Sequence, residues 1–346
     1  MRNFTTLAKR ALLGTSISMS LGLPAFAAST TTDTEVTGAG STFVNPILMR
    51  WSAAYNEKYG VKVYYQSIGS TGGLAQIKKK FVDFGASDIP MNARELAAFG
   101  LGQFPFVIGG VVPVINVPHA QPGQLKFTGA LLADIFLGKV TMWNDPEIAA
   151  VNTGVNLPAL HIVVVHRSDG SGTTFNWTNY LTKVSLAWKV RIGEGASVAW
   201  PVGLGAKGSE GVTAYVKQVP GAIGYVEYAY AVQGKLGYGL VQNREGRFIA
   251  PNAASFQAAA ETAGWSTAKD FNLVITDAPG ANAYPITATT FIIMRKKPND
   301  APRTKTVCDF FQWSLNYGQP QAMALDYAPL SPALVQQVKA YWARNF

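Results

Sequence analysis

The chain has 346 residues, of which 48% are hydrophobic and 14% charged, and its formal net charge at pH 7 is +9. Its single cysteine, Cys308, excludes an intramolecular disulfide. The basic residues are scattered, and the two runs of three, Lys78–Lys80 and Arg295–Lys297, have no aromatic residues interleaved with them as stacking platforms. We therefore expect no nucleic-acid partner.

The first 27 residues have the pattern of a cleavable signal peptide. Arg2, Lys9 and Arg10 are followed by the apolar run Ala11–Pro24 and by the small-x-small site Ala25–Ala27. The apolar run has 14 residues, fewer than the about 20 that a membrane-spanning helix needs. We expect cleavage at this site, no lipid-anchor cysteine, and a free protein of 319 residues with net charge +6 in a Gram-negative periplasm.

Segments typical of strands and of helices alternate along the rest of the chain. The expected strands are Glu35–Thr37, Lys62–Ser67, Phe81–Ala86, Val107–Asn116, His161–His166, Ile223–Tyr228 and Thr289–Met294. The expected helices are Asn45–Tyr59, Gly73–Lys80, Leu131–Leu137, Thr173–Val184, Ser209–Gln218, Thr304–Tyr317 and Pro332–Asn345. Such alternation favours an α/β fold with parallel-type layers.

Two of the strand-like segments are long enough to pass between two domains. They are Val107–Asn116 and Tyr284–Met294. A chain that crosses twice predicts a two-lobed protein with a hinge, and the cleft between the lobes is the natural ligand site. We expect residues 28–107 and 284–346 to form the first lobe and residues 108–283 the second.

One kind of turn occurs three times, each after a strand and before a helix. The turns are Thr37–Phe43, Ser67–Gly73 and Arg167–Thr173, and each combines glycines with Ser or Thr. A helix N-terminus exposes unpaired N–H groups, glycines let the backbone approach a ligand, and hydroxyls add donors. For a single turn, an ordinary N-cap explains the hydroxyl residues as well. Three such turns together indicate a site for a tetrahedral oxyanion.

Other familiar motifs are absent from these turns. None has the lysine of a nucleotide-triphosphate loop, and Phe43 stands where a dinucleotide fingerprint has Gly or Ala. Ser171 directly follows Gly170, so there is no nucleophile elbow. The histidines have no metal-like spacing with acids or with Cys308, so we expect no metal and no cofactor. Both a ligand contact and a packing role stay open for His166.

At these residues the sequence resembles the periplasmic phosphate-binding proteins of high-affinity phosphate ABC transporters. The resemblance covers essentially the whole chain after the signal peptide. It rests on the ungapped strings T-G-A-G-S-T-F at 37–43, G-S-T-G-G at 69–73, V-D-F-G-A-S-D at 82–88, F-P-F-V-I-G-G-V-V at 104–112, R-S-D-G-S-G-T at 167–173, W-P-V-G-L-G at 200–205, P-G-A-I-G-Y-V-E-Y-A-Y-A at 220–231 and P-I-T-A-T-T-F at 285–291.

The resemblance implies a type II periplasmic binding protein, with two α/β lobes, a two-strand hinge and phosphate in the cleft. Carried over by motif, the phosphate-binding residues are Ser41, Thr42, Phe43 through its backbone N–H, Ser70, Asp88, Arg167, Asp169, Ser171, Gly172 and Thr173. Asp169 is expected to brace Arg167. At positions 41 and 71, where this chain has Ser41 and Thr71, we expect relatives to carry other small residues as well, which would leave the role of the backbone unchanged.

Asp88 is the unexpected member of this set, because a carboxylate and an anion disfavour each other's ionised forms. Its presence is explained if it accepts a hydrogen bond from a proton on the ligand. Phosphate keeps such a proton near neutral pH and sulfate does not. An unpaired buried charge of this kind costs on the order of 2–5 kcal/mol, which predicts selection against sulfate.

The implied function is delivery of inorganic phosphate to the permease and ATPase subunits of an ABC importer by a monomer without catalytic residues. A phosphoester hydrolase with a serine nucleophile is one alternative, but the sequence has no metal cluster and no positioned His–acid pair for it. A binding protein for sulfate, molybdate or another oxyanion is a second alternative, and Asp88 argues against it. An additional extracellular adhesion role stays open.

Overall fold

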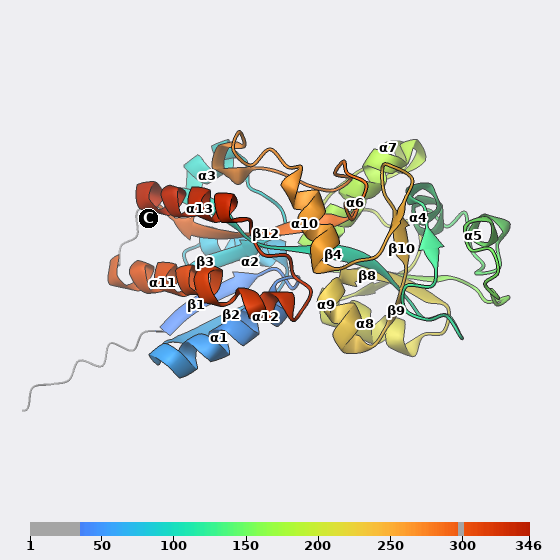
Figure 1. Cartoon of the computed structure of the whole chain (residues 1–346), viewed down its shortest axis with the longest axis horizontal. Helices are drawn as coiled ribbons and strands as arrows, with labels where there is room; N and C mark the ends of the chain where they lie inside the picture. The colour runs from blue at the N-terminus through green and yellow to red at the C-terminus, as the bar shows by residue number, and fades with distance from the viewer. Residues whose placement is uncertain (1–34, 297–300) are drawn as a thin grey trace, which may run out of the picture. The chain divides into compact units, whose positions relative to one another are not determined.

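The computed structural model describes residues 35–296 and 301–346. The predicted signal peptide lies outside these residues. The described part is α/β and is built around one nine-stranded sheet with strand order β2-β1-β3-β12-β4-β8-β6-β7, in which β9 also pairs with β4. Figure 1 shows this sheet running through two lobes, with helices packed around each.

The first lobe contains the sheet from β2 to β12. Its strands are β1 (Glu35–Gly40), β2 (Lys62–Ser67), β3 (Phe84–Ser87) and β12 (Thr287–Arg295). β1 pairs in parallel with β2 and β3, whereas β12 is antiparallel to β3. The helices are α1 (Asn45–Tyr59), α2 (Ser70–Lys78), α3 (Ala93–Phe99), α11 (Ala301–Tyr317), α12 (Gln319–Met323) and α13 (Pro332–Asn345).

The second lobe contains β6 (Val163–Arg167), β7 (Leu204–Ala206), β8 (Ala222–Glu227) and β9 (Gly237–Tyr238). β6 is parallel to both β7 and β8. A separate three-stranded sheet consists of β5 (Lys126–Phe127), β10 (Leu240–Gln242) and β11 (Phe248–Ile249). The helices are α4 (Gly129–Phe136), α5 (Pro146–Val151), α6 (Gly172–Val184), α7 (Leu186–Arg191), α8 (Gly208–Gln218) and α9 (Tyr228–Gly234).

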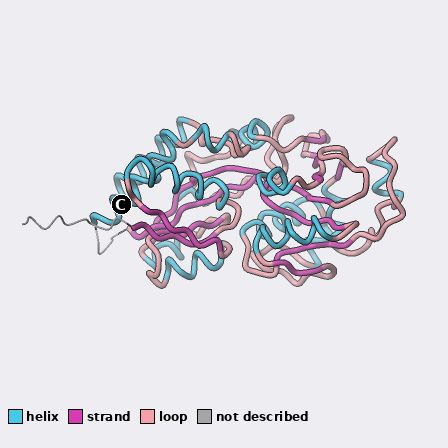
Figure 2. The backbone as a smooth tube through the Cα atoms, turned by 90° about the horizontal axis from the view of Figure 1, so that it is seen from below, coloured by secondary structure: helices cyan, strands magenta, loops and turns pink. Residues whose placement is uncertain are grey.

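The strand β4 (Leu101–Ile115) connects the lobes without interruption. Residues 101–110 pair with β12, and residues 111–115 continue as the partner of β8. All fifteen residues of β4 are buried, as expected of a strand at the centre of the sheet. Figure 2 shows long strands running between the two halves of the molecule. The prediction of two lobes joined by strand crossings is confirmed.

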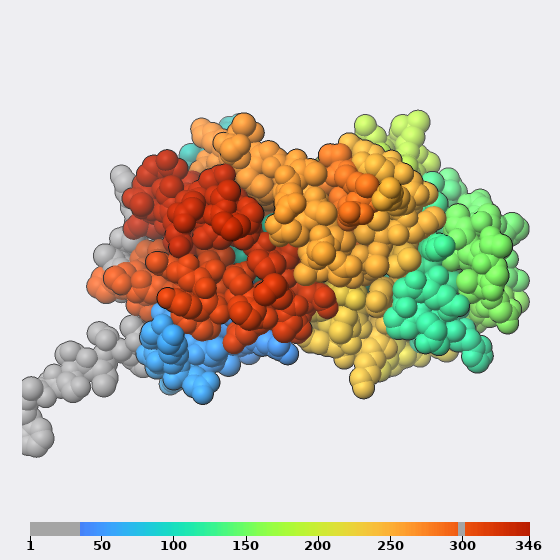
Figure 3. Space-filling model, in the orientation of Figure 1, coloured from blue at the N-terminus to red at the C-terminus, as the bar shows by residue number. Residues whose placement is uncertain are grey.

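The segment between β11 and β12 covers the junction of the lobes. It contains α10 (Ala253–Glu261) and the short helix η1 (Lys269–Phe271). The Phe256 ring packs against Tyr284 and Tyr228, with ring centroids 5.3 and 6.2 Å apart. This segment (orange) lies between the red first-lobe helices and the green second lobe on the face shown in Figure 3.

The sheet is more mixed than the alternating pattern predicts. Parallel pairs occupy its outer parts, but β12 and β8 both run antiparallel to β4. For β12 the reason is that β4 carries the chain into the second lobe and β12 carries it back. β4 also begins at Leu101, six residues before the predicted start. Pro105 lies beside a register shift opposite Thr290 and Phe291, an irregularity at which a strand tolerates a missing N–H. Within the described residues, no helix is long and apolar enough to cross a bilayer.

Candidate functional site

The first turn leaves β1 at Gly40, where neither the backbone conformation nor the available space would allow a side chain. Its φ is +145°, and a Cβ there would lie 2.0 Å from the carbonyl oxygen of Ala86. The glycine therefore lets β1 and β3 come together directly before Ser41, Thr42 and Phe43. The side chains of these three residues are buried, and the Phe43 N–H donates to Ser41 Oγ at 3.0 Å.

Asp88 lies immediately after β3 and accepts hydrogen bonds from three hydroxyl groups. Ser41 Oγ lies 2.7 and 2.6 Å from its two carboxylate oxygens, Thr290 Oγ1 is 2.6 Å from Oδ1, and Ser70 Oγ is 3.4 Å from Oδ2. The Asp88 N–H donates in return to Ser70 Oγ at 3.1 Å. These contacts fix the carboxylate beside the first and second turns.

Burial raises the pKa of Asp88 to about 6, although the hydroxyl donors and the charge of Arg167 act in the opposite direction. An acid with this pKa is mostly ionised at neutral pH and becomes protonated in mild acid. At neutral pH Asp88 is therefore an acceptor, as its expected role toward a protonated ligand requires.

Arg167 ends β6 and is held by Asp169 in a two-point contact. Its Nε donates to Oδ1 at 2.7 Å and its Nη2 to Oδ2 at 2.5 Å, and the Gly208 N–H also donates to Oδ1 at 2.9 Å. Burial alone would lower the pKa of Arg167, but its bonds to Asp169 raise it, so the side chain stays charged. Arg167 likewise lowers the pKa of Asp169 against the effect of burial. The prediction that Asp169 braces Arg167 agrees with this geometry.

The remaining nitrogen of Arg167 points at a group of hydroxyls. Nη1 lies 3.2 Å from Thr42 Oγ1, and 3.5 Å from both Thr173 Oγ1 and Ser209 Oγ. Thr42 belongs to the first lobe and Ser209 to the second, and their hydroxyl oxygens are 2.8 Å apart. The guanidinium therefore lies where the two lobes meet.

The second and third turns also touch each other. Gly69 has φ +83°, and a Cβ there would lie 2.6 Å from Asp169 Oδ2. The Thr71 N–H donates to the Gly170 carbonyl at 3.2 Å. Gly172 is equally crowded, since a Cβ on it would lie 2.4 Å from Ser70 Oγ and 2.6 Å from Asp88 Oδ2. The glycines of these turns allow the lobes to approach at this point.

The structure thus brings the ten residues of the predicted site into one cluster. Nine of them meet in the contacts described above, and Ser171 directly precedes Gly172. The Ser171 hydroxyl accepts from the Thr174 N–H at 3.1 Å and caps α6. The ordinary N-cap interpretation therefore holds for the third turn, whereas Val44 and Gly69, which precede α1 and α2, make no side-chain cap.

Two hydroxyls of the cluster, Ser209 and Thr290, are missing from the prediction. Ser209 lies at the start of α8, after Gly203, Gly205 and Gly208, so the same glycine-hydroxyl pattern was available in the sequence. Thr290 lies inside a strand, and no local pattern distinguishes its side chain from that of a packed threonine. Asn176, on α6, also reaches the cluster and donates to the Asp88 carbonyl at 2.8 Å.

Four helices begin at this cluster. α2, α6 and α8 contain Ser70, Gly172 and Ser209 in their first turns, and α1 begins three residues after Thr42. Aligned peptide dipoles give each helix N-terminus a partial positive charge. With a single arginine that is already paired to Asp169, these helix ends supply much of the favourable field for an anion.

His166 lies next to Arg167 but has a packing role. Its ring stacks on Trp200, with centroids 4.8 Å apart and planes 13° apart. Burial lowers its pKa. Among the described residues, no group of three or more His, Cys, Asp and Glu side chains is placed to hold a metal ion.

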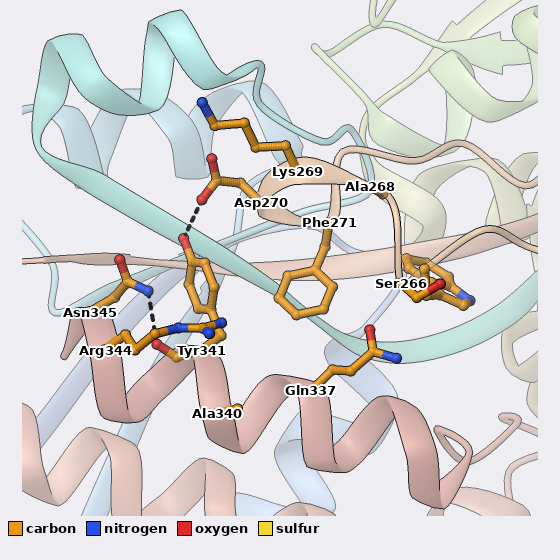
Figure 4. A pocket seen from close by; sticks show the side chains of 11 residues that line it. Ser266, Ala268, Lys269, Asp270, Phe271, Gln337, Ala340, Tyr341, Arg344 and Asn345 are labelled. Atoms are coloured by element: carbon orange, nitrogen blue, oxygen red, sulfur yellow. Dashed lines mark hydrogen bonds between the residues drawn. The ribbon is translucent and has the colours of Figure 1, made fainter.

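A hollow of about 570 Å³ lies elsewhere, between η1 and α13 (Figure 4). Lys269 and Arg344 line it, and the Tyr341 hydroxyl donates to Asp270 Oδ1 at 2.8 Å. None of the residues of the four helix-start turns lines this hollow, so it is separate from the oxyanion cluster.

Comparisons with known proteins agree with this geometry. The model of the PBP superfamily domain matches residues 25–316. The phosphate-binding protein PstS of Xylella fastidiosa is 56% identical over 319 residues, which cover 92% of this chain and 88% of that protein. The phosphate-binding protein PstS of Pasteurella multocida is 50% identical over 334 residues, with coverages of 96% and 95%.

The solved phosphate-binding protein from Stenotrophomonas maltophilia shares the fold, with a TM-score of 0.69 and 20% identity over 88% of this chain and 93% of that one. The likeness in sequence extends over nearly the whole of the two PstS relatives. The chain belongs to the PBP superfamily and, within it, to the family of the PstS phosphate-binding proteins.

Proposed function

We propose that this protein binds inorganic phosphate with high affinity in the periplasm and delivers it to the permease of a phosphate ABC importer. The observation that carries the proposal is the meeting of four helix N-termini around Arg167, with the Asp88 carboxylate at the same point. The names and the high identity of the PstS relatives support the same ligand and transporter.

In the proposed site, hydroxyls, backbone N–H groups and Arg167 donate to the phosphate oxygens. The proposed ligand residues are Ser41, Thr42, Phe43, Ser70, Asp88, Arg167, Asp169, Ser171, Gly172 and Thr173, and Ser209 is added to them. Asp88 takes the opposite role and accepts the proton that phosphate retains. The site then recognises both the charge and the protonation of the anion, which favours phosphate over sulfate.

The proposal includes no catalysis. A serine nucleophile needs an adjacent base, usually a histidine. His166, the histidine next to the cluster, is stacked on Trp200 and bonds to the Arg167 carbonyl rather than to a serine hydroxyl. These contacts favour binding over hydrolysis.

We further propose that residues 1–27 are removed on export and that the mature protein is a monomer. Its lobes comprise residues 28–107 with 284–346, and residues 108–283. Closure of the lobes around phosphate presents one surface to the permease, while the ATPase subunit acts on the other side of the membrane. The unbroken path of β4 between the lobes supports a hinge of this kind.

Titration calorimetry of the purified protein with phosphate, sulfate and a phosphate monoester tests the proposal. We expect tight binding of phosphate, much weaker binding of sulfate, and no release of phosphate from the ester. Equal affinity for phosphate and sulfate would contradict the role of Asp88, and turnover of the ester would contradict the absence of catalysis.

A further inference from the structure

Three consecutive carbonyl groups of the first turn each accept a hydrogen bond from a tyrosine. Tyr65 donates to Ser41, Tyr230 to Thr42 and Tyr327 to Phe43, and all three oxygen–oxygen distances are 2.7 Å. The bonded partners are 24, 188 and 284 positions apart in sequence. No short-range pattern connects them.

The tyrosines come from three different parts of the fold. Tyr65 lies on β2, Tyr327 lies between α12 and α13, and both belong to the first lobe. Tyr230 lies on α9 in the second lobe. Its bond to Thr42 therefore links the two lobes beside the oxyanion cluster.

The three tyrosine hydroxyls stay protonated and can therefore donate hydrogen bonds. Burial raises the pKa of each of the three tyrosines well above its usual value, so the groups keep their hydrogens throughout the physiological range. Two of the hydroxyls face a second acceptor in the second lobe, because Tyr230 lies 2.8 Å from Glu210 Oε1 and Tyr327 lies 3.0 Å from Glu227 Oε2. Each hydroxyl has one hydrogen and shares it between the carbonyl and the carboxyl oxygen, and the carbonyl is the nearer acceptor in both cases.

The direction of these bonds matters for an anion site. A backbone carbonyl oxygen carries partial negative charge and would repel an anion if it turned inward. A carbonyl and the N–H of the next residue belong to the same peptide group and point in opposite directions. A tyrosine that holds the Thr42 carbonyl therefore also fixes the direction of the Phe43 N–H and polarises it. This N–H donates to Ser41 Oγ at 3.0 Å in the structure and is a proposed donor to phosphate when the ligand is bound.

We propose that Tyr65, Tyr230 and Tyr327 are positioning residues of the oxyanion site. They hold the three carbonyls of the first turn away from the ligand and its N–H groups toward it. Tyr230 has a second effect, because its bond can form only when the lobes meet, so it retains the ligand in the closed protein. This inference rests on the proposed function, since phosphate is the ligand by which it is tested.

The test compares the single variants Tyr65→Phe, Tyr230→Phe and Tyr327→Phe, which keep the ring and remove the hydroxyl. A typical hydrogen bond contributes about 1 kcal/mol, so each change should weaken phosphate binding by up to about fivefold. The largest effect is expected for Tyr230→Phe, because its bond joins the two lobes. Tyr180→Phe is the matched control, because Tyr180 is buried and its hydroxyl donates to the Gln242 carbonyl at 3.4 Å, outside the cluster. Tyr180→Phe should bind phosphate with the affinity of the wild type, and its thermal stability should be similar to that of the three variants of the site.

Two further readouts separate positioning from a general structural role. In stopped-flow measurements, Tyr230→Phe should increase the phosphate dissociation rate about fivefold and leave the association rate unchanged. In NMR spectra, the Phe43 amide proton should move upfield in Tyr230→Phe and stay in place in Tyr180→Phe. The three tyrosine variants are separate tests. If one of them fails to fold, the phosphate affinities of the other two still test the positioning role.

The outcomes are distinguishable from those for the proposed function. A wild-type protein that does not bind phosphate would contradict the proposed function before any variant is considered. A wild-type protein that binds phosphate, together with tyrosine variants of unchanged affinity and dissociation rate, would overturn the positioning role alone.

Discussion

The hydroxyl oxygens of Thr42 and Ser209, 167 positions apart in the chain, lie 2.8 Å from each other across the two lobes. Both also face Nη1 of Arg167. Each comes from the turn at the start of a helix, so the contact brings the N-termini of α1 and α8 together. An anion between the lobes would meet donors from both sides at this point.

Ser209→Ala should weaken phosphate binding by about fivefold, because one hydroxyl donor of about 1 kcal/mol is lost. Ser52→Ala is a suitable control, since Ser52 is also buried and its hydroxyl donates to the Leu48 carbonyl within α1. Calorimetry on both variants checks the prediction. An effect of the same size in both would show that Ser209 has no special place in the site.

Arg167→Ala should weaken phosphate binding by at least about 30-fold, the equivalent of about 2 kcal/mol for a buried charged partner. Arg167→Lys should recover only part of this loss, since an ammonium cannot reproduce the two-point contact with Asp169. Arg244→Ala removes an exposed partner of Asp277 and serves as the control. Wild-type affinity in Arg167→Ala, measured by calorimetry, would remove this residue from the site.

Gly172→Ala should interfere with binding and leave the helix intact. The new Cβ would meet Ser70 Oγ and Asp88 Oδ2 at 2.4 and 2.6 Å, and overpacking of this kind costs about 1–3 kcal/mol. We expect a loss of phosphate affinity of roughly 5- to 150-fold with an unchanged circular dichroism spectrum. Gly211→Ala on α8, where a Cβ meets nothing closer than 3.5 Å, should bind normally. If Gly172→Ala also binds normally, the lobes do not approach this closely around the ligand.

Asp88→Asn should narrow the preference for phosphate over sulfate, because the neutral amide does not repel an unprotonated oxygen. Lowering the pH through about 6 should act in the same direction in the wild type, since Asp88 then becomes protonated. Asp83→Asn is the control, because Asp83 is paired with Arg303 outside the cluster. Calorimetric affinities for both anions at pH 5 and pH 7.5 check this. An unchanged ratio would assign the selectivity to the shape of the site instead.

Glu227→Gln should alter how stability depends on pH. Burial raises the pKa of Glu227 well above its usual value, and its Oε1 is buried without a hydrogen-bond partner. The folded state then binds more protons than the unfolded state as the pH rises above the unfolded pKa. The free energy of unfolding of the wild type should fall with rising pH, by up to about 1.4 kcal/mol per unit.

In Glu227→Gln this contribution disappears. The free energy of unfolding of the variant should therefore rise relative to that of the wild type between pH 5 and pH 7. Urea denaturation at several pH values measures the difference. Glu261→Gln, at an exposed position on α10, should follow the wild type. Parallel curves for Glu227→Gln and the wild type would show that Glu227 titrates normally.

Much of the site could be predicted from the sequence, because three of its four turns are local patterns. A strand end, a glycine, a hydroxyl residue and a helix start all lie within about seven neighbouring residues, and backbone chemistry makes such a turn suitable for an anion. Ser209 follows the same pattern but lacked the clear strand signal, since β7 has only three residues. The short helices α3, α5, α7, α9 and α12 were not predicted, because five to seven residues carry too little periodicity.

The sequence by itself determined the class of the fold, the strand crossings and the residues that present donors at helix starts. The tertiary structure alone decided which of these residues meet. The contacts of Thr42 with Ser209, of Thr290 with Asp88 and of the three tyrosines with the first turn join positions far apart in the chain. They depend on β4 and β12 carrying the chain from one lobe to the other, and on glycines at the junction that leave room for the lobes to touch. Local sequence patterns do not encode such distances, because they arise only when distant segments are packed against each other.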